Sequence, residues 1–448
     1  MSQQFSPERC IKNLSDAVQI KTVSSPDGKN QDYAPFDHFI LFLSKAYPLC
    51  HRQLEHTRIN NYGLVYRLKG KNRDADPLLF LSHYDILQPA PEYEHLWSYS
   101  PFEGTVCDGF IHGRGILRSK AALIALFETI ERLLESGQQP ERDVYLAVGF
   151  DSLSGGNLGT SRIVSFFKSQ KLHFDCILDV GGCCINGLLP QLQRNVALIG
   201  VGSKGCADLK ITLNKPCGST VIPKEENALT ALAQILVDIQ NNPMPAHLTP
   251  PIKTLLKRIA PDLGGSRRRL FDHIDLFKPS LLKHLSKSPL TNALIRTIVV
   301  SSMFSGSPSS GIFPYQSNAI LKCHLLPGDR IDDVIQHIRR LAPKEALSFD
   351  VLNLHEPSPI FSDETTAFRQ LEACASVVFP NLQTAPSLCL VAGDLQKYST
   401  LSNQIYQFTP ICLTLEDLES ISGINEKISF DNLLNAVTFY TMFILNYQ

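Results

Sequence analysis

The sequence predicts an α/β protein with a doubly wound, mostly parallel sheet and a smaller inserted α+β domain. Three observations lead to this fold class. Short apolar runs in the first half of the chain alternate with segments whose apolar residues recur at helical spacing. Such alternation is typical of parallel strands joined by helical crossovers. After about residue 205 the strands show a two-residue period, and the first pattern returns after about residue 355.

Three short apolar segments of the first half are predicted to be buried strands. They are residues 77–82 (PLLFLS), 143–150 (DVYLAVGF) and 175–179 (DCILD). Leu, Ile and Phe recur at helical spacing over residues 120–136, and a second helix is predicted over 158–168. These elements alternate along the chain, as a doubly wound sheet requires.

The middle of the chain predicts a β-α-β-α unit of its own. Strands are expected over 207–213 and 318–325, and helices over 227–239 and 331–341. The stretch 243–289, rich in Pro, Lys and Arg, is not assigned to any element. Three parts are expected. Residues 1–203 form the first part of the large domain, 204–350 the inserted α+β domain, and 351–448 the second part of the large domain.

Composition and charge limit the classes of function. Lys plus Arg total 42 and Asp plus Glu total 43, giving a formal charge of -1. No basic surface for nucleic acid or for an anionic membrane is therefore expected. We expect no signal peptide and no membrane-spanning helix. The twelve cysteines contain no CxxC pair, so reduced thiols and a cytoplasmic location are expected.

Polar side chains stand where the predicted strands end. His83 follows the first strand, Asp151 follows the second, and Asp179 ends the third. Ligands of parallel α/β sheets bind in the crevice outside the carboxyl ends of the strands. The sequence therefore predicts a ligand site that includes these three side chains.

Five motifs, in order along the chain, resemble those of a known family. The first is an apolar strand followed by an HxDVVP-like run, at 81–89 (LSHYDILQP), and the second is a W…PF segment at 97–102 (WSYSPF). The third is a DGxxxGRG turn at 108–115 (DGFIHGRG), followed by Lys120. The last two are a lid-entry segment at 201–205 (VGSKG) and a GxNEKI-like segment at 424–428 (INEKI). The chain resembles the M20 family of zinc-dependent peptidases and amidohydrolases, nearest to its vacuolar carboxypeptidase and N-acyl-amino-acid hydrolase branch. The resemblance implies a zinc-exopeptidase-like fold with a lid domain that dimerises.

The resemblance also implies a paired zinc site. One carboxylate bridges the two ions, His and acidic side chains complete each shell, and a free glutamate takes a proton from the attacking water. By position, His83 matches the first histidine ligand and Asp179 matches a terminal carboxylate ligand. Asp85 matches the catalytic carboxylate that orients the site near His83.

Four other positions of that site carry different residues. The bridging aspartate falls at Arg118, the general-base glutamate at Ser152, and the glutamate ligand beside it at Leu153. The C-terminal histidine ligand falls at Ser422, and the last histidine of the chain is His355. A paired zinc site at these positions is therefore not expected, and metal binding should be weak or absent.

The substrate contacts that the family implies have changed as well. Asp394 keeps an aspartate of a substrate-binding motif. The lid histidine, the lid asparagine, the lid arginine and the carboxylate-binding arginine fall at Ser219, Gly311, His324 and Gln396. Three of these four positions therefore carry no ionisable side chain.

Two functions follow from this pattern. The favoured one is a catalytically inactive protein that binds a small peptide or N-acyl amino acid, or that forms a homodimer or heterodimer through the lid domain. The alternative is a hydrolase of such substrates with a reduced or rebuilt metal site, built from His83, Asp85, His112, Asp151, Asp179 and Cys183. A simpler interpretation makes His112 a turn residue and Cys183 a core residue. We also hypothesise that Arg118 pairs with Asp179 where the metals are missing.

Overall fold

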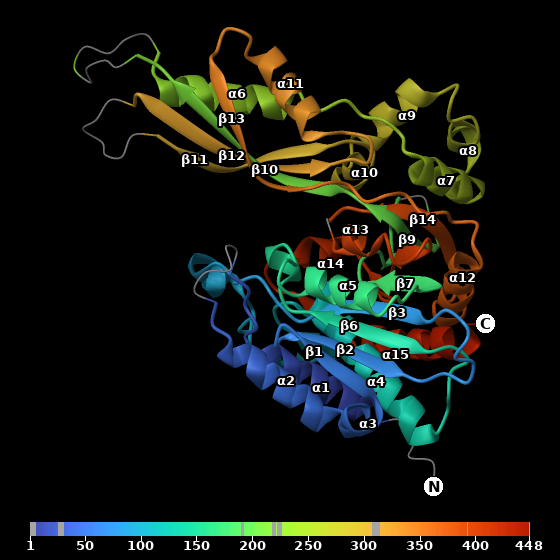
Figure 1. Cartoon of the computed structure of the whole chain (residues 1–448). Coiled ribbons are helices and arrows are strands. Elements are labelled where there is room, and N and C mark those ends of the chain that lie inside the picture. The colour runs from blue at the N-terminus through green and yellow to red at the C-terminus, as the bar shows by residue number, and fades with distance from the viewer. Residues whose placement is uncertain are drawn as a thin grey trace.

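Two sheets organise the molecule. The computed structural model describes residues 6–25, 31–189, 192–216, 221, 226–306, 314–391 and 393–447. In Figure 1 the smaller sheet and its helices lie above the larger sheet, which has helices on both sides. The chain passes from the larger sheet to the smaller one between β9 and β10.

The larger sheet is mixed and mostly parallel, and it confirms the predicted fold class. Its central strands β6, β3, β7 and β15 are parallel, and β14 pairs with β9 in parallel. The antiparallel strands β1 and β2 form one edge. In the described residues the sheet has ten strands, which are, in spatial order, β1 (Glu55–Ile59), β2 (Gly63–Leu68), β6 (Val144–Gly149), β3 (Leu78–His83), β7 (Cys176–Asp179), β15 (Ile405–Gln407), β9 (Asn195–Ser203), β8 (Cys184–Ile185) and β16 (Cys412–Leu413), with β14 (Leu382–Cys389) beside β9.

Successive side chains of the central strands point to opposite faces, which is why both faces are covered by helices. In β3, Leu78 and Phe80 pack into one hydrophobic core, and Leu79 and Leu81 pack into another. One core is shared with α1 (Pro7–Gln19), α2 (Ala34–Ala46), α4 (Ala121–Ser136), α12 (Thr366–Val378) and α15 (Phe430–Asn446). The other is shared with α5 (Thr160–Ser169) and α13 (Leu395–Tyr398).

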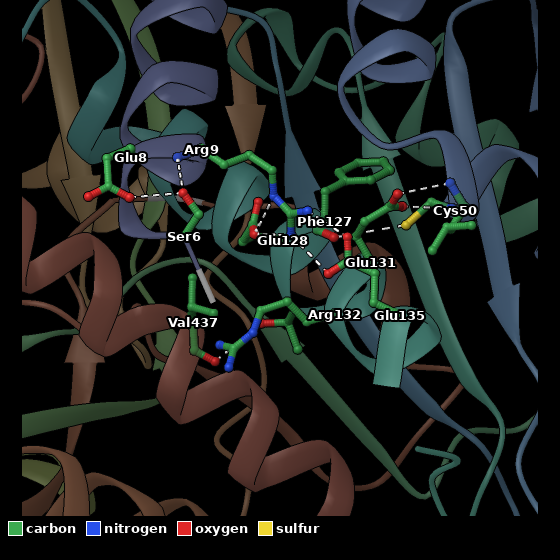
Figure 2. A network of polar contacts seen from close by, with 12 residues as sticks. Ser6, Glu8, Arg9, Cys50, Phe127, Glu128, Glu131, Arg132, Glu135 and Val437 are labelled. Carbon is green, nitrogen blue, oxygen red and sulfur yellow. Dashed lines mark hydrogen bonds and ion pairs between the residues drawn. The ribbon is translucent and has the colours of Figure 1, made fainter. Parts of the chain in front are cut away.

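Buried charges join the helices on the first of these faces, as Figure 2 shows. The Arg9 Nε donates a hydrogen bond of 3.0 Å to the fully buried Glu128 carboxylate, linking α1 to α4. Glu131 accepts the backbone N–H groups of Leu49 and Cys50 at 2.9 and 2.8 Å. These N–H groups belong to the first turn of α3 (Pro48–Gln53), so Glu131 satisfies donors that a helix start leaves free.

The smaller sheet is antiparallel and is covered by helices on one face. Its order is β11 (Ile298–Ser305), β12 (Gln316–Leu325), β10 (Gly205–Asn214) and β13 (Leu347–His355). Helices α6 (Ala228–Asn241) and α11 (Ile331–Leu341) pack on it in a separate hydrophobic core. Pairing of β13 with β10 continues to His355, beyond the expected boundary at residue 350. The proposed division into domains remains a prediction.

The stretch 243–289, which the sequence left unassigned, begins a group of short helices. They are α7 (Pro250–Ile259), a 3-10 turn (Ala260–Asp262), α8 (Gly265–Asp272), α9 (Lys278–Leu285) and α10 (Pro289–Ile295). Four of these five elements have proline at their first or second position, where its missing N–H costs nothing. The prolines therefore start helices here instead of preventing them.

The remaining elements are short. A small sheet joins β17 (Lys427–Ser429), β5 (Phe110–His112) and β4 (Val106–Cys107). The other helical segments are Pro91–Leu96, Ile116–Lys120, Ser152–Ser154 and α14 (Leu415–Ser420). Within the described part of the chain, every helix is too short or too polar to cross a membrane.

Candidate functional site

A cavity of about 560 Å³ lies at the carboxyl ends of the central strands. His83 at the end of β3, Gly149 at the end of β6 and Asp179 at the end of β7 all contribute to its wall. These strands are neighbours, so their ends meet at one edge of the sheet. The structure therefore brings His83 and Asp179 to the crevice where the sequence predicted them.

His83 and Asp85 form a buried pair at this edge. The His83 Nδ1 and the Asp85 Oδ1 are 2.8 Å apart, and Asp85 is fully buried. The other Asp85 oxygen accepts the Leu153 N–H at 2.8 Å and the Ser24 hydroxyl at 3.2 Å. Burial raises the pKa of Asp85, but the His83 imidazole and these donors outweigh it and leave the pKa below its ordinary value. Asp85 thus holds His83 in place.

Asp179 is a buried carboxylate with one short and one long hydrogen bond among the described residues. It accepts its neighbour's backbone N–H, that of Val180, at 2.8 Å. The Gln407 Nε2 lies 3.4 Å from the other oxygen, which is a long contact. Burial, together with the charge of Asp394, raises the pKa of Asp179 to about 7. The side chain lines the cavity.

Arg118 reaches the same cavity from a tight backbone turn. It lies in the helical segment Ile116–Lys120, which follows Gly115 at a φ of 81°. A Cβ on Gly115 would lie 2.4 Å from a methyl carbon of Ile86, so only glycine fits there. The buried Glu426 carboxylate accepts the N–H groups of Gly115 and Leu117 at 3.0 and 2.7 Å. These contacts explain why the INEKI motif lies so far from the turn in sequence but next to it in space.

Arg118 does not pair with Asp179, so that hypothesis is wrong. In the part of the chain that the structure describes, no hydrogen bond or ion pair joins the Arg118 guanidinium to any acceptor. Burial lowers the pKa of Arg118, and more distant Asp85, Glu426 and Asp179 partly offset this. Glu426 is occupied by backbone N–H groups and Asp85 by His83, so neither is available as a partner.

Ser152 and Asp394 form a second polar cluster on the wall. The Asp394 Oδ2 accepts the hydroxyl groups of Ser152 and Thr160 at 2.7 and 2.6 Å. The Asp394 Oδ1 pairs with the Lys397 ammonium at 2.9 Å. Asp394 is therefore saturated by protein donors, and the Ser152 hydroxyl acts as one of them.

The other predicted residues divide between the cavity and its surroundings. Leu153 and Ser422 line the cavity, and Ser422 adopts a left-handed conformation with a φ of 59°. His324 lies on β12 with a buried Nδ1 that has no partner among the described residues, and Gln396 lies in α13; neither lines the cavity. Ser219 and Gly311 lie outside the described residues.

The candidates for a rebuilt metal site do not gather. His112 lies on β5 with its ring centre 4.5 Å from that of Tyr99, and it does not line the cavity. Asp151 accepts the backbone N–H groups of Leu158 and Gly159. Cys183 lines the cavity, but burial raises the pKa of its thiol to about 12, so it is protonated at neutral pH.

The sequence predicted two retained ligand positions of a paired zinc centre, His83 and Asp179, and both line the cavity. Such a centre needs a bridging carboxylate and further His or acidic ligands on each ion. Among the described residues, no group of three or more His, Cys, Asp and Glu side chains could hold a metal ion. The cation Arg118 stands on the wall that the retained His83 and Asp179 share.

Two features of the site were missed by the sequence interpretation. Helix α10 contributes Leu290 and Leu294 to the wall, and it comes from the end of the unassigned stretch. The Lys204 ammonium, buried where β9 meets β10, donates to the carbonyls of Ala293 and Arg296 at 2.9 and 2.7 Å. A lysine in the apolar lid-entry motif was a usable signal, but its partners could not be inferred from sequence.

Known proteins resemble the whole chain. The family model described as "Peptidase family M20/M25/M40" matches residues 79–446. The "Probable carboxypeptidase S-like 2" of Dictyostelium discoideum is 30% identical over 97% of this chain and 84% of its own length. The "N-fatty-acyl-amino acid synthase/hydrolase PM20D1" of Mus musculus is 28% identical over 99% of this chain and 89% of its own length.

Solved structures share the fold at low sequence identity. The M20 family metallo-carboxypeptidase Sso-CP2 from Sulfolobus solfataricus has a TM-score of 0.69 at 15% identity, covering 97% of this chain and 98% of its own. Human carnosine dipeptidase 1 also has a TM-score of 0.69, at 14% identity, with coverage of 98% and 96%. The family match over most of the chain, together with the fold and the site at the strand ends, shows that the chain belongs to the M20/M25/M40 peptidase family.

Proposed function

We propose that this protein binds a small ligand in its 560 Å³ cavity and does not carry out paired-zinc amide hydrolysis. The observation that carries the proposal is the presence of Arg118, at the position of the bridging aspartate, on the same wall as His83 and Asp179. A guanidinium about 4 Å from a dication would be repelled by roughly 8 kcal/mol at an effective dielectric near 20. One histidine and one carboxylate are too few ligands to offset that repulsion.

The proton-transfer step also lacks its base. Ser152 stands at that position, and its hydroxyl donates to Asp394 instead of accepting a proton. Loss of a general base lowers a rate by about 10²- to 10⁴-fold. Asp85 does not replace it, because His83, Leu153 and Ser24 already donate to its two oxygens.

The ligand class is proposed from the cavity and the relatives together. Cavities of a few hundred Å³ with mostly apolar walls and a few polar groups are typical of small-molecule sites. The relative from Mus musculus is named for N-fatty-acyl amino acids, and those from Dictyostelium discoideum are named as carboxypeptidase S-like. We therefore propose that a small peptide or N-acyl amino acid binds here and is released unchanged.

Metal analysis of the purified chain tests this proposal. We expect no stoichiometric zinc after purification and no rise in melting temperature on adding zinc, because a metal that binds only the folded state would raise it. The matched control is a variant with the family's residues restored at four positions, Arg118→Asp, Ser152→Glu, Leu153→Glu and Ser422→His, which should gain a zinc-dependent rise. Two tightly bound zinc ions per wild-type chain would overturn the proposal, and one bound ion with chelator-sensitive hydrolysis would favour a hydrolase with a reduced site.

We also propose that the smaller sheet associates with a second copy of this chain. Strand β11 ends that sheet, and Val300, Met303 and Phe304 on it are exposed at 52%, 64% and 45%. An exposed apolar edge strand is a template for pairing with another chain. Sedimentation should show a dimer of this chain, and Phe304→Lys should weaken it. A wild-type protein that stays monomeric at high concentration would exclude the homodimer. A dimer that forms only with an active relative would favour a heterodimer instead.

A reducing, cytoplasmic location is part of the proposal. The cysteines among the described residues are all free, and most are buried. Burial favours the neutral thiol, which suits small core residues better than disulfide or metal chemistry. Fractionation of cells followed by thiol labelling of the unfolded chain would test it, with extensive disulfide formation in an exported fraction as the contrary result.

A further inference from the structure

The Arg118 guanidinium is an unusual group to find on a cavity wall. It carries five N–H donors, and no acceptor among the described residues takes any of them. The residue is half-buried on the cavity wall, so its donors are open to a molecule that enters the cavity. A cation that the fold positions firmly but leaves without a partner is suited to bind an anion from outside the protein.

The rest of the wall is mainly apolar. Leucines gather around the space, among them Leu117, Leu153, Leu198, Leu290, Leu294 and Leu388. Leu153 stands at the position of a glutamate ligand, next to the serine at the base position. An apolar cavity with one guanidinium favours a ligand with an apolar body and one acidic group.

The replaced positions also change the electrostatics of the cavity in one direction. Arginine in place of the bridging aspartate, with neutral residues in place of two glutamates, shifts the side-chain charge by as much as two zinc ions would supply. The cavity therefore repels an acidic ligand less than one that kept those three carboxylates would without metals. Asp179, Asp394 and Glu419 remain on the wall, and Asp394 is neutralised by Lys397 and two hydroxyl donors.

We propose that Arg118 takes the place of the metal ions as the group that anchors the ligand, by binding the carboxylate of an amphipathic acid whose apolar chain lies against the leucine wall. The planar fork of a guanidinium matches a carboxylate with two parallel hydrogen bonds. This assignment rests on the proposed function, because a cavity filled by zinc would have no room for the guanidinium at that position.

Asp179 distinguishes two ligands that both carry an apolar chain and a carboxylate, an N-acyl amino acid and a free fatty acid. Among the described residues, the long Gln407 contact is the one hydrogen bond to the Asp179 Oδ2, so a donor on the ligand beside its carboxylate could bind there. An N-acyl amino acid has such an amide N–H, and a free fatty acid has none. N-dodecanoylglycine binding more tightly than dodecanoate would identify the first source, and equal binding would identify the second.

Calorimetric titration of the full chain tests the proposal with dodecanoate, N-dodecanoylglycine, dodecanol and acetate. We expect both acids to bind. Dodecanol, which has no carboxylate, and acetate, which has no long apolar chain, should bind at least about 10-fold more weakly. Arg118→Gln should weaken both acids by about 10- to 100-fold, and Arg118→Lys should restore part of the loss without the bidentate geometry. Leu290→Trp, which fills the wall, should weaken the acids while leaving the guanidinium in place.

Controls separate this proposal from folding and from the proposed function. Arg58→Gln removes an exposed cation on β1 and should leave binding unchanged. Melting temperatures of the Arg118 variants should equal or exceed that of the wild type, because the guanidinium has no hydrogen bond or ion pair with the described residues. Acids that bind Arg118→Gln as tightly as the wild type, or no binding of either acid, would overturn this inference while the metal analysis still stands. Stoichiometric zinc would overturn the proposed function instead.

Discussion

Arg118 and Lys120 lie on the same backbone turn, yet their surroundings are opposite. The Lys120 ammonium is fully buried and donates to the carbonyls of Ala17 and Ile20 at 2.8 Å each. Arg118 faces the cavity with no partner among the described residues. The difference separates buried charges that hold the scaffold together from a charge that is positioned for a ligand.

The same contrast holds for the carboxylates. Glu426 accepts backbone N–H groups and fixes the turn, and Asp394 accepts from two hydroxyl groups and an ammonium. Asp179 has one short contact, with the N–H of the next residue. Removing a charge that protein groups hydrogen-bond should lower the free energy of unfolding. Removing a charge without such partners should leave it unchanged or raise it.

The largest effect is expected for Glu426→Ala. This change leaves the buried N–H groups of Gly115 and Leu117 without acceptors and creates a cavity, so unfolding free energy should fall by about 3–5 kcal/mol. Urea denaturation measures this loss. The matched variant on the same turn is Arg118→Ala, whose unfolding free energy should stay within about 0.5 kcal/mol of the wild type. Equal losses for the two variants would break the comparison.

Asp394→Ala should cost less, about 2 kcal/mol, because the side chain is partly accessible to water. Ser152 and Thr160 would lose their acceptor, and Lys397 would lose its ion pair. Denaturant unfolding measures the loss. If Asp394 served the ligand alone, stability would be unchanged and ligand affinity would fall instead.

Lys120→Met tests a cation that is hydrogen-bonded inside the protein, through the pH dependence of the unfolding free energy. Burial lowers the pKa of Lys120 from 10.5 to about 7, so between these values the unfolded chain holds a proton that the folded protein has lost. Wild-type stability should therefore gain up to about 1.4 kcal/mol per pH unit above pH 7 relative to the variant. The difference in unfolding free energy between the two proteins, measured from pH 7 to 8.5, gives this slope. A difference that does not vary with pH would mean that Lys120 stays charged.

Asp179→Asn should raise the stability of the protein instead of lowering it. The folded-state pKa is raised from 3.8 to about 7, so stability falls as pH rises through this window and the full cost applies above pH 7. The variant should be more stable by up to about 4 kcal/mol at pH 8, with the gain fading toward pH 4. Thermal unfolding at both pH values measures it. A loss of stability at pH 8 would point to a bound metal or donor at Asp179.

The central sheet could be predicted because its signals are local. Residues 77–82 are a short run of apolar residues, and β3 is buried at every position. The prolines in 243–289 were harder to interpret, since a proline that breaks a helix interior can equally begin a helix, and only packing against the core decides. Strand β13 was missed because most of its side chains are exposed, which leaves no clear alternation of apolar residues.

Sequence alone determined the fold class and the family resemblance, and it predicted changed residues at four positions of the expected site. Each of these depends on residue type and order, which the chain carries without folding. Tertiary structure decided that Arg118 has no partner among the described residues, that Asp394 is saturated and that α10 contributes to the cavity wall. Whether a charge is matched depends on groups that lie hundreds of residues away in sequence, as Glu426 does from Gly115, and only folding brings them within hydrogen-bonding distance.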